Sequence, residues 1–597
     1  MRLDAIDISI ILGYFAVTII IGFYVSKRAS KNMGSYFLGG NTLPWYLLGI
    51  SNASGMFDIT GTMWLVYACV VYGLKSAWLP WLWPVFNQIF LMVFLSIWLR
   101  RSNVLTGAAW LATRFGKGRD AELAHISVVV FALVSAVGFL AYAFKGIGKF
   151  AAIFLPWNLS PDIYALIIMG LTAMYAVKGG MFSVVITEVL QFLVMTVASI
   201  AVGIIAMMRV SPDMLARVVP DGWKSMWFGW QLNLDWTGIL DSVNDKIIQD
   251  GYSLFAIFFM IMLFKGLLIS LAGPAPNYDM QRVLATRNPR EAGLMSGFVN
   301  VVLLFPRYLM VMGFTVLTLV FLKPELQAMG ANIDFEAILP LAIVKFIPVG
   351  LMGILLAGLL AAFMSTFAAT LNAAPAYIVN DIYKRYFNAN AEPRKYVYMS
   401  YLASLLVLVV GIAFGFVVES INQVMLWIVS ALWGGYTAAN VLKWYWWRFN
   451  GYGYFWGMLS GIVAALAVPK IFPHLSELNA FPIVLIVSTI GSILGCLLTK
   501  PTEESVLKDF YTSVRPWGFW KPIYEKVIQD DRGFKRNTNF KRDSFNIAIG
   551  MIWQISLTVL PMFFVIKEIK GIVISTIVIG VTSVILKKNW YDKLQSN

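Results

Sequence analysis

The chain has 597 residues, of which 59% are hydrophobic and 13% are charged, and its mean hydropathy is +0.74. Soluble globular domains carry about 25% charged residues, so this composition excludes an ordinary soluble protein. Apolar runs recur along the chain, and many reach the roughly 18 residues that let a helix cross a ~30 Å hydrocarbon core. The sequence therefore predicts an all-α polytopic membrane protein.

Fifteen apolar segments are expected to form membrane helices. They are residues 6–25, 45–72, 77–99, 122–154, 161–178, 182–208, 252–275, 293–322, 339–376, 397–418, 421–442, 453–470, 480–499, 546–566 and 570–587. If the N-terminus is outside, most of the 46 Lys and Arg residues fall in segments that face the cytoplasm. We therefore expect the N-terminus outside and the C-terminus inside. The net charge of +15 is then explained by topology and does not point to nucleic acid.

Two of these segments carry residues that weaken a helix. The second contains GISNASGMFDITG, residues 49–61, which places Asp58 among glycines and hydroxyl side chains inside an apolar run. Small residues also let helices pack closely, which is the ordinary alternative. An intramembrane carboxylate is costly and usually functional, so Asp58 favours a binding site.

The seventh segment is interrupted by Pro274 and Pro276. Proline removes a backbone donor and clashes with the preceding turn, and exposed backbone cannot face lipid. The two interrupted segments each begin a group of five helices, and the two groups have opposite orientations. This pattern is typical of a secondary transporter built from inverted repeats, with its site at the bilayer midplane.

The predicted organisation follows from these two repeats. In chain order it comprises an N-terminal helix and cytosolic loop (1–44), the first repeat (45–208), an extracellular loop (209–251), the second repeat (252–442), two helices (443–499), a cytosolic segment (500–545) and two additional helices with a tail (546–597).

Other intramembrane polar groups could join a site at the breaks. Ser365 and Thr366 are adjacent in the ninth segment, although such hydroxyls often bond only to their own helix. Glu188 lies in the sixth segment and Lys145 in the fourth, where the lysine could meet Glu188 or a substrate carboxylate. Hard oxygen ligands of this kind suit an alkali cation rather than a soft transition metal.

Five motifs in order resemble those of the sodium:solute symporter family. They are YFLGGNTLPW at Tyr36, YAVKGGMFSVVITEVLQ at Tyr175, QRVLA at Gln281, LLAAFMST at Leu359 and WWRFNGYGYFWGMLSGIV at Trp446. The resemblance covers residues 5 to 500. It implies a leucine-transporter-type fold of five plus five inverted helices and sodium-driven import of a small solute.

The resemblance also implies the positions of the ion sites. The sodium ligands would be the backbone carbonyls of Met56, Ile59 and Ala362 and the hydroxyls of Ser365 and Thr366. A second ion or the coupling step could involve Asp58 and Glu188, where the family usually has Asp in place of this glutamate.

Candidates for substrate binding or gating are Lys145, Asn277, Tyr278 and Gln423, and Tyr278 sits where the galactose symporter has its gate tyrosine. The position of the sugar members' binding glutamate falls near Leu74 and Lys75, so the solute class stays open among sugars, sialic acids, amino acids and other organic acids.

No catalytic constellation or cofactor motif is present, so we expect neither an enzyme nor a cofactor. Sodium is the expected coupling ion. The alternatives are proton coupling within the same fold and a non-transporting membrane sensor. The expected partners are the solute, sodium and the lipid bilayer, with no obligate protein partner. The resemblance implies an integral protein of a bacterial inner membrane.

Overall fold

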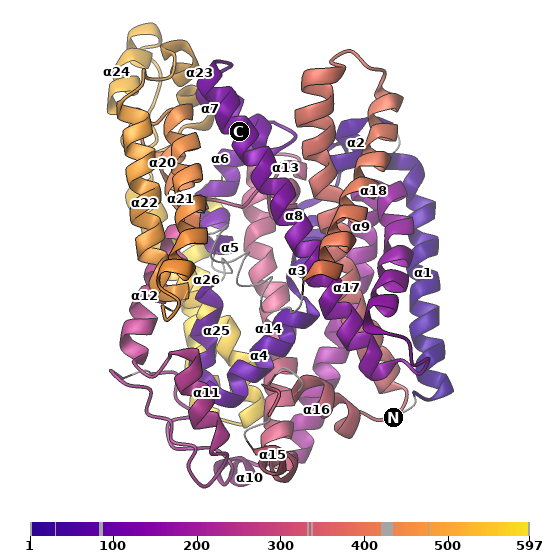
Figure 1. Cartoon of the computed structure of the whole chain (residues 1–597). Helices are drawn as coiled ribbons and strands as arrows, with labels where there is room; N and C mark the ends of the chain where they lie inside the picture. The colour runs from indigo at the N-terminus through magenta and orange to yellow at the C-terminus, as the bar shows by residue number, and fades with distance from the viewer. Residues whose placement is uncertain are drawn as a thin grey trace.

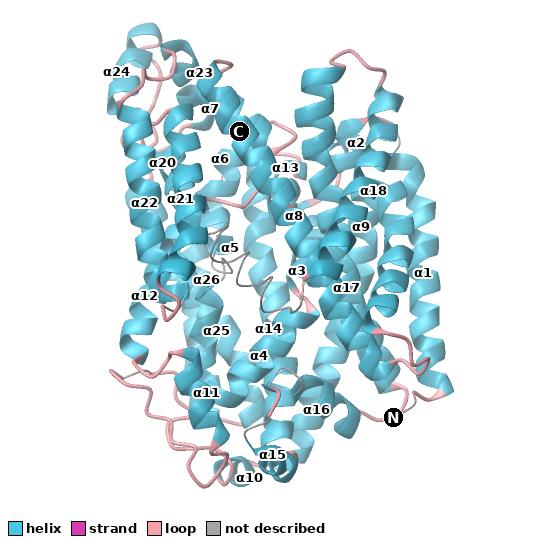
Figure 2. Ribbon diagram, viewed as in Figure 1, coloured by secondary structure: helices cyan, strands magenta, loops and turns pink. Residues whose placement is uncertain are grey.

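The computed structural model describes residues 3–29, 31–82, 87–227, 229–330, 333–335, 338–418, 434–475 and 477–594. Across these ranges the chain is built from helices and carries no named strand (Figures 1 and 2). Eleven helices of this part are long and apolar enough to cross a membrane. That is fewer than the fifteen expected segments, because some segments are broken into short helices, two are merged, and 421–442 is only partly described.

The second expected segment, 45–72, consists of two helices that meet at a break. Helix α3 is Trp45–Met56 and α4 is Ile59–Tyr72, and only Phe57 and Asp58 separate them. The seventh segment is broken as well. Helix α12 is Phe255–Leu271, α13 is Tyr278–Ala285, and the two prolines lie between them. Both interruptions predicted from composition are therefore present.

The carbonyls freed by the second break are satisfied by neighbouring side chains. Trp444 Nε1 donates to the Ala272 carbonyl at 3.1 Å, and Asn87 donates to that of Gly273 at 3.3 Å. The Tyr436 hydroxyl donates to the Pro274 carbonyl at 3.2 Å. This pairing lets irregular backbone lie inside the bundle without unsatisfied acceptors.

Two further segments differ from the prediction. Residues 161–178 and 182–208 form one continuous run, α9 (Pro161–Arg209), whose two halves meet at a kink where Gly180 has φ +51°. The expected helix 339–376 is instead α16 (Ile338–Phe346) and α17 (Leu351–Ala376). Pro348 and Gly350, the latter at φ +84°, lie between them and explain the interruption.

The remaining elements complete the bundle. They are α1 (Ala5–Ala29), α2 (Met33–Leu38), η1 (Gly39–Asn41), η2 (Gly73–Leu82), α5 (Asn87–Phe90), η4 (Leu91–Leu95), α6 (Ser96–Arg101), α7 (Gly107–Phe115), α8 (Arg119–Phe154), α10 (Pro212–Ala216), α11 (Ser242–Asp250), α14 (Pro289–Phe321), α15 (Lys323–Met329), η7 (Tyr377–Phe387), α18 (Pro393–Val417), α20 (Gly434–Tyr445), α21 (Gly451–Ile471), α22 (Glu477–Leu497), α23 (Glu504–Val514), α24 (Lys521–Asp530), α25 (Phe540–Ile566), α26 (Ile569–Asn589) and η9 (Tyr591–Lys593).

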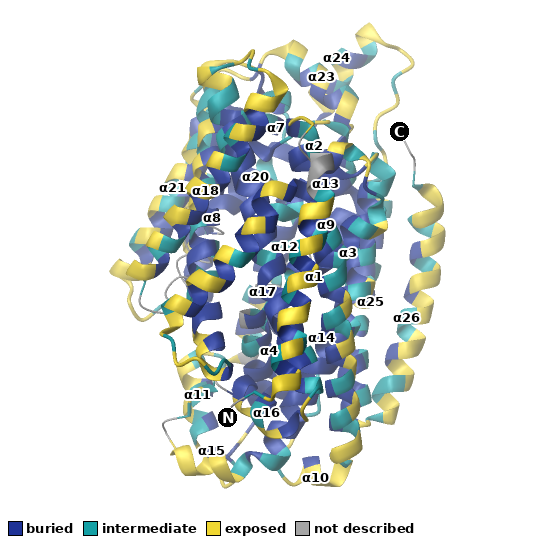
Figure 3. Ribbon diagram, turned by 90° about the vertical axis from the view of Figure 1, so that its right-hand side faces the viewer, coloured by how far each residue is buried: buried dark blue, intermediate teal, exposed yellow. Residues whose placement is uncertain are grey.

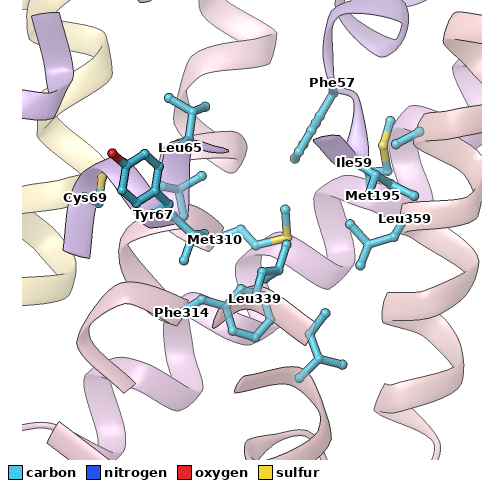
Figure 4. Packing of buried hydrophobic residues seen from close by; sticks show 14 of the residues in the cluster. Phe57, Ile59, Leu65, Tyr67, Cys69, Met195, Met310, Phe314, Leu339 and Leu359 are labelled. Carbon is cyan, nitrogen blue, oxygen red and sulfur yellow. The ribbon is translucent and has the colours of Figure 1, made fainter. Parts of the chain in front are cut away.

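Burial divides these helices into an inner and an outer set (Figure 3). Helices α4, α14 and α17 are mostly buried, whereas α1 and α26 expose most of their apolar surface, as expected of helices that face lipid. Phe57 and Ile59, which flank the first break, share a hydrophobic cluster with Met195 of α9 and Leu359 of α17 (Figure 4). The break is therefore held at the packed centre of the bundle.

The connecting segments gather at the two ends of the bundle. Helices α10, α11 and α15 lie at one end, and α23 and α24 lie at the other (Figure 1). At the first of these ends, Trp223 and Trp236 donate their indole N–H groups to the carbonyls of Val70 and Val71, at 3.0 and 3.2 Å. The long loop 209–251 thus covers the last turn of α4.

Candidate functional site

Asp58 immediately precedes α4 and lines a small cavity. Its carboxylate accepts the backbone N–H of Gly61, which makes it the N-cap of the helix. This capping bond gives a local reason why a carboxylate is accommodated at the start of α4. It uses only one of the two carboxylate oxygens, so the same side chain can also interact with the adjoining cavity.

The carbonyl of Gly55, at the end of α3, joins three separate elements. It accepts the hydroxyl of Thr366 from α17 at 2.8 Å and that of Tyr278 from α13 at 3.3 Å. The Thr366 hydroxyl also lies 3.3 Å from the carbonyl of Ala362. The Gly55 carbonyl, which was not among the predicted ligands, therefore connects the end of α3 with α13 and α17.

Met56 departs from the predicted arrangement. Its carbonyl accepts Nη1 of Arg307 at 3.0 Å, whereas the neighbouring Gly55 carbonyl contacts Thr366. Consecutive residues of a helix are rotated by about 100° around its axis, so the Gly55 carbonyl contacts α13 and α17 while the Met56 carbonyl contacts α14. Ile59 is buried at the start of α4 and lines the adjoining cavity.

Arg307 was not identified as a site residue from the sequence. It lies in the middle of α14 and is almost entirely buried. The signal that could have revealed it is an arginine within an apolar span, since intramembrane charges usually mark a functional position.

Glu188 is the centre of a second polar group. Both of its oxygens lie 2.6 Å from Nη2 of Arg282, and it also accepts hydrogen bonds from the hydroxyls of Ser51 and Ser365. Ser51 in turn accepts from Arg282 Nε at 2.8 Å. These residues come from α9, α13, α3 and α17, so the group links the two predicted repeats.

A small cavity lies between the start of α4, helix α8 and helix α17. Its polar lining groups are Asp58, Thr366 and Thr370, and its aromatic lining comes from Phe139, Tyr142, Phe363 and Phe367. The lining thus combines a carboxylate and two threonine hydroxyls, which can hydrogen-bond, with aromatic rings, which offer apolar surface.

Lys145 lies on α8 but does not meet Glu188. Its Nζ lies 3.4 Å from Asp162 of α9, whereas Glu188 pairs with Arg282. The neighbouring α8 residues Ala143 and Gly146 line the cavity, and a one-residue step along a helix turns a side chain by about 100°. The expected Lys145–Glu188 contact is therefore replaced by a pair with Asp162.

Asn277 and Gln423 are the remaining residues predicted to bind substrate or form a gate. Asn277 is the N-cap of α13, where its side chain accepts the backbone N–H of Asp279 at 3.0 Å. Gln423 lies outside the described residues.

The donor set suits a hard monovalent cation. The Gly55 and Ala362 carbonyls and the Thr366 hydroxyl are neutral oxygens that lie together beside the first break, whereas the Ser365 hydroxyl donates to Glu188. In the part of the chain that the structure describes, no group of three or more His, Cys, Asp and Glu side chains could hold a metal ion.

Comparison with known proteins identifies the same architecture. The profile described as the sodium:solute symporter family matches residues 36–461. The chain is 25% identical over 502 residues to the sodium/mannose cotransporter of Bos taurus, covering 77% of this chain and 78% of the relative. It is 24% identical over 561 residues to sodium/glucose cotransporter 1 of Mus musculus, covering 86% and 81%.

A solved structure of a Na⁺-coupled sialic acid symporter in a substrate-bound, outward-open state superposes with a TM-score of 0.66 at 18% identity, covering 84% of this chain and 99% of that one. This likeness confirms the leucine-transporter-type fold. This structural match covers 84% of the chain. The sequence alignments with the two cotransporters cover 78% and 81% of those relatives.

Proposed function

The chain belongs to the sodium:solute symporter family, and from this membership we propose that it imports a small organic solute together with sodium by alternating access. The observation that carries the proposal is the Gly55 carbonyl, which Thr366 and Tyr278 approach from the second repeat. An ion bound beside this oxygen would contact both repeats, and its binding would then depend on how they are arranged.

The proposed sodium ligands lie on the α17 side of the first break. They comprise the hydroxyls of Ser365 and Thr366 and the Ala362 carbonyl, together with a carbonyl from the end of α3. The contact between Gly55 and Thr366 favours Gly55 as that carbonyl. The sequence-predicted Met56 carbonyl instead accepts Arg307, and Ile59 stays a predicted ligand. Sodium would replace the hydrogen bonds that these oxygens now make with one another.

The proposed solute site is centred on the cavity beside Asp58, whose volume of about 30 Å³ in this structure has to widen before a solute can enter. Aromatic rings can stack on the apolar face of a sugar or polyol, while Asp58, Thr366 and Thr370 bond to its hydroxyls. Relatives transport mannose and glucose according to their names, and the solved neighbour binds a sialic acid. We therefore place sugars, polyols and sialic acids first among the solutes, followed by amino acids and other organic acids.

Tyr278 and Asn277 are proposed to form a gate at the second break. Tyr278 contacts the end of α3 through the Gly55 carbonyl, and Arg282 lies one turn beyond it on α13. Movement of α13 relative to α3 would break the Tyr278 contact and open one face of the site.

The proposed topology keeps fifteen membrane helices with the N-terminus outside and the C-terminus inside, in a bacterial inner membrane. In this orientation sodium entry is favoured by an inside-negative potential, at about 2.3 kcal/mol per charge per 100 mV. That energy drives accumulation of the solute if sodium binds preferentially to the outward-facing state.

Thermal unfolding of the purified protein tests the proposal. Sodium is compared with potassium at equal ionic strength, each combined with hexoses, inositols, sialic acids, amino acids and organic acids. A solute that raises Tm only in sodium would identify the substrate and demonstrate linkage between the sites. Failure of sodium to change Tm, alone or with any solute, would contradict sodium coupling.

Proton coupling is the alternative within the same fold. It would require Glu188 to take up a proton and release Arg282, and the direct pair between them makes this residue the candidate. In the same experiment, a solute effect that follows pH and is indifferent to sodium would support this alternative. A sensor would bind the solute but would not accumulate it in proteoliposomes.

Lys145 stays a predicted substrate contact, with its pairing to Asp162 as the competing structural role. If Lys145 binds the solute, Lys145→Ala will raise the solute concentration that gives half-maximal uptake. Asp162→Ala serves as the control, because it removes the pair without removing the lysine. An unchanged concentration dependence in Lys145→Ala would eliminate the substrate contact.

A further inference from the structure

Arg307 places a full positive charge inside the membrane bundle. It lies near the middle of α14, between Pro306 and Tyr308, and its exposed fraction is only 8%. A long side chain near a helix end can reach the membrane surface, but Arg307 instead donates Nη1 to the Met56 carbonyl at 3.0 Å. The charge is therefore directed at the first helix break.

The surroundings of the guanidinium are negative in character but contain no direct ion pair. Its Cζ lies 5.7 Å from the centre of the Phe57 ring, and its Nε is buried without a hydrogen-bond partner among the described residues. Among the described residues, no carboxylate oxygen lies within 4.0 Å of the Arg307 guanidinium nitrogens. The carbonyl end of α3 and the nearby Asp58 are what the charge faces.

Gly61 keeps Asp58 and Arg307 close to each other. A Cβ atom at this glycine would lie 2.7 Å from Asp58 Oδ1 and 3.1 Å from Arg307 Nη2. Because any side chain would displace one of the two charged groups, the glycine allows both to approach the start of α4.

We propose that Arg307 is a built-in cation that takes, at the Met56 carbonyl and beside Asp58, the place a second metal ion would hold. Sodium is then confined to the α17 side of the break, where Gly55, Ala362 and Thr366 lie. This inference rests on the proposed sodium coupling and extends it to the number of ions bound.

The chemistry of the two sides of the break supports this division. On the α17 side the described oxygens are neutral carbonyls and a hydroxyl, and no charged donor bonds to the Gly55 or Ala362 carbonyl among the described residues. On the α14 side the Met56 carbonyl already receives a charged donor. Two like charges at neighbouring carbonyls repel strongly in a poorly solvated site, so the guanidinium disfavours a metal ion at Met56.

Glu188 follows the same pattern. The two carboxylates that the sequence offers for a second ion are Asp58 and Glu188, and the structure places an arginine beside each. Arg282 lies 2.6 Å from Glu188, and Arg307 faces the break that Asp58 begins. Fixed guanidinium groups thus accompany both candidate positions for a second sodium.

Direct counting of bound sodium tests the proposal without knowledge of the solute. Binding of ²²Na⁺ to the purified full-length protein is measured for the wild type, Arg307→Met and Arg307→Lys. Arg290→Met is the matched control, because it removes the same charge from the first turns of the same helix. Sodium-dependent Tm curves at constant ionic strength provide a second readout.

We expect the wild type, Arg307→Lys and Arg290→Met to bind one sodium per chain. Arg307→Met should bind two, with a steeper dependence of Tm on sodium concentration. An Arg307→Met protein that binds one sodium with an unchanged midpoint would overturn the proposal. A wild type that binds no sodium would instead contradict the proposed function, so the two failures are distinguishable.

A double variant covers the case in which Arg307→Met does not fold. If Arg307 serves as a counter-charge, Arg307→Met combined with Asp58→Asn removes both charges and should restore a folded protein that binds one sodium. A double variant that stays unfolded would show that Arg307 acts through packing. That result would overturn the proposal that Arg307 serves as a built-in cation.

Discussion

The guanidinium of Arg282 and the carboxylate of Glu188 form a buried ion pair in which one nitrogen, Nη2, lies 2.6 Å from both carboxylate oxygens. Arg282 belongs to α13 and Glu188 to α9, so the pair joins the two predicted repeats. Ser365 donates to the same carboxylate at 3.1 Å, which places a proposed sodium ligand in direct contact with this connection. Sodium binding at Ser365 would therefore alter a contact that holds the repeats together.

Removing one partner of this pair should destabilise the protein strongly. Glu188→Gln leaves Arg282 buried without its carboxylate, and breaking a buried pair from one side costs about 3–5 kcal/mol. We expect a large fall in Tm, with part of the loss recovered when Glu188→Gln is combined with Arg282→Met.

The exposed pair between Lys345 and Glu325 is the control for this experiment. Its side chains are 41% and 47% exposed, and such surface pairs contribute about 0–1 kcal/mol. Glu325→Gln should therefore change Tm little. Equal effects of Glu188→Gln and Glu325→Gln would show that the buried pair is not a structural connection.

Thr366 should determine sodium affinity. Thr366→Val keeps the shape of the side chain but removes the hydroxyl that reaches the Gly55 carbonyl. We expect the sodium concentration for half-maximal thermal stabilisation to rise about tenfold or more, which corresponds to about 1.4 kcal/mol. Thr366→Ser, which retains the hydroxyl, should remain close to the wild type.

Thr315→Val provides the matched control for the loss of a hydroxyl. Thr315 is buried in α14, where its hydroxyl donates to the Val311 carbonyl of the same helix. This substitution should leave sodium affinity unchanged. A Thr366→Val protein with wild-type sodium affinity would remove this hydroxyl from the proposed site.

Asp7 should stabilise the helix that carries the proposed sodium ligands. Its Oδ1 accepts the backbone N–H groups of Gly350 and Gly353, both at 2.7 Å, at the beginning of α17. Loss of a capping side chain costs about 0.5–2 kcal/mol, so Asp7→Ala should lower Tm.

Asp4→Ala is the comparison for this variant, because Asp4 caps only its own exposed helix start through Ile6. If Asp7 positions α17, Asp7→Ala should also weaken sodium binding, whereas Asp4→Ala should not. A fall in Tm without any change in sodium affinity would limit Asp7 to a structural role.

Asp250 should make stability depend on pH. It lies in α11, outside the membrane spans, and its carboxylate accepts the hydroxyls of Tyr67 and Tyr72. Burial raises the pKa of Asp250 to about 7, although Lys246 lies 3.0 Å away and favours the charged form. The ordinary pKa of an aspartate is ~3.9.

The direction of the effect follows from this difference. The folded protein binds more protons than the unfolded chain between these two pKa values, so the contribution of Asp250 is fully present below about pH 4 and is lost as the pH rises through about 7. Tm measured against pH should fall less steeply in Asp250→Asn than in the wild type. Asp245→Asn, an exposed change on the same helix, should keep the wild-type profile. Identical profiles for all three proteins would contradict the buried, protonated carboxyl.

The sequence by itself determined the class of the protein and the positions of its breaks. Apolar run length fixes which segments span a membrane, and glycines and prolines interrupt hydrogen bonding wherever the chain folds. For this reason the interruptions around Asp58 and Pro274 could be predicted from local residues alone. The division of residues 339–376 had a local signal as well, at Pro348 and Gly350, but hydropathy concealed it.

Only the tertiary structure decided which side chains meet across the breaks. Arg307 and Met56 are 251 residues apart in the sequence. No local sequence pattern specifies a contact between residues so far apart. The sequence offered Glu188 or a substrate carboxylate as partners of Lys145, but Glu188 pairs with Arg282 and Lys145 pairs with Asp162. Helix rotation and packing set these pairings, because a single-residue step around a helix changes the neighbour that a side chain reaches.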